Sequence, residues 1–93
     1  MPDQPHRPTQ PSPSAGADTK TERAVLAFVL SLHPTRLTQG ELTRALADDP
    51  EDFAQRDAIV RAVGELVAAG LLHRDGAFVA PTRAAIRFDQ LTV

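Results

Sequence analysis

A helix end and a tight turn follow one another closely between Leu66 and Val79. Gly70 comes directly after a helical run, at the position where a left-handed C-terminal cap belongs. Asp75-Gly76 then separates two short apolar runs, which predicts a β-hairpin over residues 71–79. A chain of 93 residues has room for one small domain. We therefore expect a mainly α fold with a small β-hairpin.

Capping signals predict two helices early in the chain. A capping box over residues 19–22 opens a helix that ends before Pro34, because the residue before proline is pushed out of the helical region. A second capping box over residues 38–41 opens a short helix that ends near Ala47.

Two further helices flank the hairpin. The third starts between Glu51 and Ala54 and runs to Ala69, and the fourth follows Pro81 with Thr82 as its cap. Residues at helical or strand spacing form the predicted core: Val25, Phe28, Val29, Leu32, Leu37, Leu42, Leu46, Ile59, Val63, Leu66, Leu72 and Val79.

Residues 1–17 differ in composition from the rest of the chain. Five of the eight prolines lie there, and alanine is the only aliphatic residue after Met1. Such a segment buries too little apolar area to offset its chain entropy. We predict a disordered Pro-rich tail over residues 1–17, either a solvated leader or a ligand of a proline-binding module, and a folded domain over residues 18–93.

Composition excludes several classes of function. The net charge of −2 excludes a strongly basic nucleic-acid-coating protein, and the lack of cysteine excludes disulfides, cysteine zinc sites and thiol catalysis. The histidines at 6, 33 and 73 do not have the spacing of metal ligands, and no catalytic motif is visible. We expect no enzyme, no cofactor and no metal site.

The predicted location is the cytoplasm of a bacterium. No apolar run reaches the ~18–20 residues of a membrane span, and the N-terminus lacks the pattern of a secretory signal. Arginine outnumbers lysine nine to one and alanine is abundant, a pairing typical of a G+C-rich bacterial genome.

The order of helices and hairpin resembles the winged helix-turn-helix domains of bacterial transcription regulators of the MarR-like and ArsR-like kind. In that family the pattern L-x-x-x-G-L-[LIV]-x-R-x-G marks the end of the recognition helix and the start of the wing. The residues that match it are Leu66, Gly70, Leu71, Leu72, Arg74 and Gly76. The resemblance covers about residues 19–91. It implies a small DNA-binding transcription regulator with the third helix in the major groove and the 71–79 hairpin as the wing.

The expected contacts with double-stranded DNA come from three segments. In and before the second helix they are Arg36, Thr38, Gln39, Thr43 and Arg44; in the third helix, Gln55, Ala58 and Arg61; in the hairpin, His73 and Arg74. Arg61 lies between Asp57 and Glu65 at helical spacing, so it also fits a solvated ladder of charges.

An acidic cluster before the third helix supports a second interpretation. Asp48, Asp49, Glu51 and Asp52 favour a helix N-terminus but repel phosphate. The alternative function is therefore a winged-helix module or adaptor that binds protein and not DNA.

Apolar residues on the first and last helices predict a homodimer. The apolar arc of the first helix leaves Leu26 and Leu30 with little to cover them, and the last helix carries Ile86, Phe88 and Leu91. A two-fold pair through these residues would bury them. The rival explanation is that the last helix folds back and covers Leu26 and Leu30 within one chain.

Overall fold

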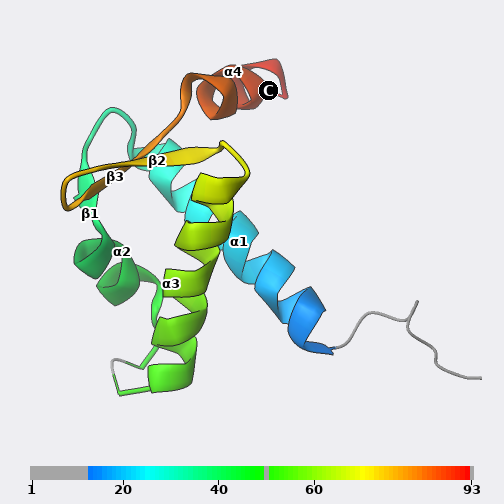
Figure 1. Ribbon diagram of the computed structural model, residues 1–93, viewed down its shortest axis with the longest axis vertical. Helices are drawn as coiled ribbons and strands as arrows, with labels where there is room; N and C mark the ends of the chain where they lie inside the picture. The colour runs from blue at the N-terminus through cyan, green and yellow to red at the C-terminus, as the bar shows by residue number, and fades with distance from the viewer. Residues whose placement is uncertain (1–12, 50, 93) are drawn as a thin grey trace, which may run out of the picture.

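The computed structural model describes residues 13–49 and 51–92 (Figure 1). This part of the chain is mainly helical with a small antiparallel sheet, as predicted. The elements are α1 (Pro13–Leu32), β1 (Leu37–Thr38), α2 (Gln39–Leu46), α3 (Phe53–Ala68), β2 (Leu72–Asp75), β3 (Phe78–Pro81) and α4 (Arg83–Leu91).

Helix α1 begins at Pro13, six residues before the predicted start at Thr19. Proline suits the first position of a helix because its φ is already helical and its missing N–H would have no partner there. The predicted boundary between tail and domain therefore falls inside α1, and the rest of the predicted tail lies outside the described residues. The other end of α1, at Leu32 before His33-Pro34, is as predicted.

The sheet has three strands, one more than the predicted hairpin. The predicted strands β2 and β3 pair with each other, and β1 adds to the other side of β3 to give the order β1-β3-β2. Val79 faces Leu37 on one side and Arg74 on the other. At the turn, Gly76 has a φ of 61°, which glycine adopts without steric cost. The two residues of β1 are too few to show a strand periodicity in the sequence.

The end of α3 has the predicted left-handed cap. Gly70 has a φ of 81°, and its N–H donates to the Val67 carbonyl oxygen at 3.1 Å. The N–H of Leu71 donates to the Leu66 carbonyl oxygen at 2.9 Å. These two bonds form a Schellman motif, which ends the helix and directs the chain into β2.

One apolar core joins α1, α2, α3 and the sheet. Its largest buried side chains are Leu42, Leu72, Val25, Val29, Val63 and Val79, and Ile59 and Leu66 lie beside them. Most of the predicted core is therefore confirmed. Phe28, Leu37 and Leu46 are only partly buried against it. Leu32 was predicted wrongly: it is the last residue of α1 and is 37% exposed.

Candidate nucleic-acid interface

The start of α2 is fixed by a reciprocal pair of hydrogen bonds. The Glu41 N–H donates to the Thr38 hydroxyl at 3.1 Å, and the Thr38 N–H donates to Glu41 Oε1 at 2.8 Å. These bonds hold the pKa of Glu41 below its ordinary value of 4.5, the backbone bond from Thr38 being the largest cause. The predicted capping box is confirmed, and it already uses the hydroxyl of Thr38.

A groove runs between this end of α2 and the β2–β3 hairpin. Its volume is about 340 Å³, and its lining residues are Thr38, Gln39, Gly40, Arg74, Gly76, Ala77 and Phe78. Across it, Arg74 Nη2 donates to Gln39 Oε1 at 3.4 Å. A Cβ placed on Gly40 would lie 3.9 Å from Arg44 Nη1. The fold therefore brings Arg44 and Arg74, thirty residues apart in the sequence, to the same helical turn.

Arg36 joins the segment before β1 to the hairpin. Its Nη2 donates to Asp75 Oδ2 at 3.0 Å, and its guanidinium lies 5.6 Å from the centroid of the Phe78 ring. Both partners of the ion pair are more than half exposed, so the pair contributes little to stability. The charge of Arg36 is offset by Asp75.

Two other predicted contact residues have different surroundings. Thr43 is buried, and its hydroxyl donates to the Gln39 carbonyl oxygen at 2.8 Å. This placement does not fit the predicted phosphate contact, because the hydroxyl satisfies the backbone of its own helix. His73 is exposed on β2, and Arg74 precedes the turn by two residues and is not at its tip.

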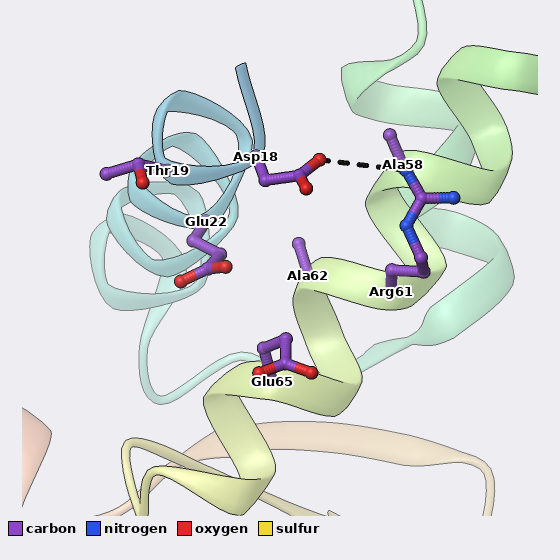
Figure 2. Close-up of a pocket in the computed structure, with 7 residues that line it drawn as sticks. All are labelled: Asp18, Thr19, Glu22, Ala58, Arg61, Ala62 and Glu65. Carbon is purple, nitrogen blue, oxygen red and sulfur yellow. Dashed lines mark ion pairs between the residues drawn. The ribbon is translucent and has the colours of Figure 1, made fainter. Parts of the chain in front are cut away.

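Two of the predicted DNA contacts in α3, Ala58 and Arg61, lie beside α1. Ala58 and Arg61 line a groove of about 270 Å³ with Ala62 and Glu65 from α3 and Asp18, Thr19 and Glu22 from α1 (Figure 2). Arg61 Nη2 lies 3.6 Å from Asp18 Oδ1. This pair could not be predicted, because the predicted helix began after Asp18.

The acidic cluster and Gln55 organise the turn between α2 and α3. The Gln55 N–H donates to Asp52 Oδ1 at 3.1 Å, which makes Asp52 the N-cap of α3. The side chain of Gln55 in turn accepts from the Asp48 N–H at 3.0 Å. Asp49 Oδ1 accepts from the Glu51 N–H at 2.9 Å. Capping and turn formation therefore account for Asp49 and Asp52, and the carbonyl oxygen of Gln55 is already engaged.

The exposed face of α3 also carries apolar residues that were not among the predicted DNA contacts. Phe53 is 70% exposed and Val60 is 40% exposed, and their spacing of seven residues puts them on one face. The guanidinium of Arg56 lies 5.9 Å from the centroid of the Phe53 ring. That spacing could have identified the face, because neither residue belongs to the core stripe of Ile59 and Val63.

The residues predicted for a dimer contact border a second groove, between α1 and α4. This groove has a volume of about 430 Å³, and Leu26, Leu30, Leu71, Ala85 and Phe88 form its apolar lining with Asp89 and Thr92 at the side. Helix α4 contacts α1, so Leu26 and Leu30 are half-covered within one chain. Ile86 is also half-buried, whereas Phe88 and Leu91 stay 67% and 64% exposed.

Searches for other kinds of site and for relatives gave negative results. Within residues 13–49 and 51–92, no group of histidine or acidic side chains could hold a metal ion. In the same part of the chain, no helix combines the length and the apolar character needed to cross a membrane. Comparison with models of known protein families, with curated proteins and with solved structures found no match.

Proposed function

We propose that the chain is a winged-helix protein that binds double-stranded DNA and regulates transcription. In this proposal β2 and β3 form the wing, α3 enters the major groove and the start of α2 lies against the phosphate backbone. The order of three helices, a hairpin and a last helix supports it, since the resemblance implies that order. In this arrangement the wing and the start of α2 contact the duplex from the same face of the protein.

The observation that carries the proposal is that Arg44 and Arg74 each extend to the first turn of α2. Arg74 reaches Gln39 from β2, and Arg44 passes Gly40 from within the helix. Two guanidinium groups near this helix start supply positive charge and donors for phosphate oxygens, beside the Glu41 carboxylate of the capping box. Arg44 and Arg74 are therefore the proposed phosphate contacts.

Asp49 and Asp52 have structural roles in the turn before α3, but their negative charges still repel phosphate, so in this proposal the turn lies away from the duplex. Their side-chain oxygens accept backbone N–H groups in the turn and at the start of α3. The chain thus has a reason to keep acidic residues there that does not involve a partner.

The alternative, a module that binds protein, has support from the exposed apolar residues of α3. An aromatic side chain that is 70% exposed, on the same helix face as a valine that is 40% exposed, is typical of a protein contact. The acidic turn next to Phe53 would suit such a contact as well. DNA binding remains the stronger proposal because two arginines from separate elements extend to the first turn of one helix.

A salt titration distinguishes the two functions. The binding of a labelled random-sequence duplex is measured by fluorescence anisotropy over a range of potassium chloride concentrations. Wild-type protein should bind with an affinity that falls as salt rises, because phosphate contacts release counterions. Arg44→Ala and Arg74→Ala should each flatten the slope of log K against log salt by about 0.9.

The matched control is Arg87→Ala, which removes the same charge from an exposed position of α4. It should leave the slope unchanged. Equal effects of all three variants would mean that only net charge matters, and no salt-dependent binding by the wild type would favour the protein-binding alternative.

A further inference from the structure

Arg61 faces outward on α3 yet pairs with a different helix. At about 100° per residue, its side chain leaves α3 about 160° away from both Ile59 and Val63, which are buried. From that position it reaches Asp18, with Nη2 3.6 Å from Oδ1. The contact depends on the part of α1 that carries Asp18, Thr19 and Glu22, which lies across the groove from the middle of α3 (Figure 2).

The groove around this pair holds more negative than positive charge. Glu22 from α1 and Glu65 from α3 line it with Asp18, and Arg61 is the only cation among its lining residues. Ala58 and Ala62 separate the helices with small side chains, which lets α1 come close to α3. Arg61 is therefore held in an acidic environment that a phosphate group would not enter readily.

We propose that Asp18 is an intrachain competitor of DNA phosphate for Arg61. In the free protein Asp18 holds the guanidinium toward α1, and binding to DNA must break this pair before Arg61 can reach a phosphate. The first turns of α1 thus act as an autoinhibitory element that weakens binding to any duplex. This inference rests on the proposed DNA-binding function.

The pair is weak enough to be broken by a ligand. Both side chains are about half exposed or more, at 63% for Arg61 and 49% for Asp18. Exposed ion pairs of this kind change an equilibrium by at most about fivefold. The element therefore adjusts affinity and does not block binding.

The test compares Asp18→Asn with Asp48→Asn against the random duplex in the salt titration described above. Both variants remove one negative charge near α3, but Asp48 lies in the turn before the helix and not in the groove of Arg61. We expect Asp18→Asn to bind about two- to fivefold more tightly than Asp48→Asn. The salt slopes of the two variants should be the same, since Arg61 contacts phosphate in both complexes.

A third variant assigns the gain to Arg61. Asp18→Asn combined with Arg61→Gln should lose the tighter binding, and its salt slope should be flatter by about 0.9 because one phosphate contact is lost. Equal affinities of Asp18→Asn and Asp48→Asn, or a gain that survives Arg61→Gln, would overturn the competition while leaving the proposed function intact. Absence of salt-dependent binding in the wild type and in every variant would overturn both.

Discussion

The hydroxyl of Thr82 donates a hydrogen bond of 2.8 Å to the carbonyl oxygen of Gly70. The same hydroxyl accepts from the Ala85 N–H at 3.2 Å, and the Thr82 N–H donates to the Leu71 carbonyl oxygen at 3.0 Å. One residue thus caps α4 and joins it to the junction between α3 and β2. The position of α4 over that junction depends on this residue.

Replacing Thr82 should therefore destabilise the protein measurably. Thr82→Ala removes the N-cap of α4 and the bond to Gly70, and should lower the free energy of unfolding by about 1–2 kcal/mol. Urea unfolding followed by circular dichroism measures the change. Thr92→Ala is the control, because the hydroxyl of Thr92 donates to the Asp89 carbonyl oxygen in the last turn of the same helix. Equal stabilities of the two variants would contradict the role of Thr82.

Two glycines in and after α3 should respond to alanine in opposite directions. Gly70→Ala forces a side chain into a left-handed conformation and should cost about 1–2 kcal/mol. Gly64 lies inside the helix, where an added Cβ meets no atom within 4 Å, so Gly64→Ala should stabilise by about 0.5–1 kcal/mol. Thermal unfolding of both variants checks the signs, and a stabilising Gly70→Ala would contradict the cap.

The capping box of α2 should make stability depend on pH below neutrality. Because folding lowers the pKa of Glu41, its contribution is present above the ordinary value of 4.5 and is lost as pH falls through the lowered value. Glu41→Gln does not titrate at this position. The difference in unfolding free energy between wild type and Glu41→Gln should therefore shift against the wild type as pH falls below 4.5. A difference that stays constant with pH would refute the assignment.

The corrected core can be tested with two leucines. Leu42 is fully buried, so Leu42→Ala should cost about 2–5 kcal/mol. Leu32 was predicted as core but is 37% exposed at the end of α1. Leu32→Ala should therefore lower the free energy of unfolding by about 1 kcal/mol or less. Chemical denaturation of both variants measures the difference. Similar decreases in the free energy of unfolding for both variants would mean that Leu32 belongs to the core.

We propose that two copies pair through α1 and α4, since Phe88 and Leu91 stay exposed beside a groove lined by Leu26 and Leu30. Light scattering of the wild type should give twice the chain mass of 10.0 kDa. Phe88→Glu, which places a charge at the rim of the groove, should give the monomer mass. A wild type that is already monomeric, with Phe88→Glu unchanged, would leave only the packing of α4 within one chain.

Local signals in the sequence predicted most of the fold. The cap at Gly70, the turn at Gly76, the capping box at Thr38 and the cap at Thr82 each depend on residues within a few positions of one another. Spacing also identified most of the core, because buried positions recur at helical intervals. These features need no knowledge of how distant segments meet.

Long-range contacts could not be predicted in the same way. The pairing of β1 with β3 and the contact of Arg74 with Gln39 join segments more than thirty residues apart. Arg61 was assigned to an outward face correctly, but its partner Asp18 lay in a segment predicted to precede the helix. Thr43 was predicted as a phosphate contact because it carries a hydroxyl group. The residue type alone does not show that this hydroxyl donates to a carbonyl oxygen of its own helix.

Thr38 belongs to two elements at once, as the last residue of β1 and the N-cap of α2. Because no loop separates them, the pairing of Thr38 with Phe78 also sets the rotation at which α2 leaves the sheet. A slip of one residue in that pairing would turn the side chains of β1 to the opposite face and carry the start of the helix with it. The two residues of β1 therefore determine where the first turn of α2, to which Arg44 and Arg74 extend, lies relative to the hairpin.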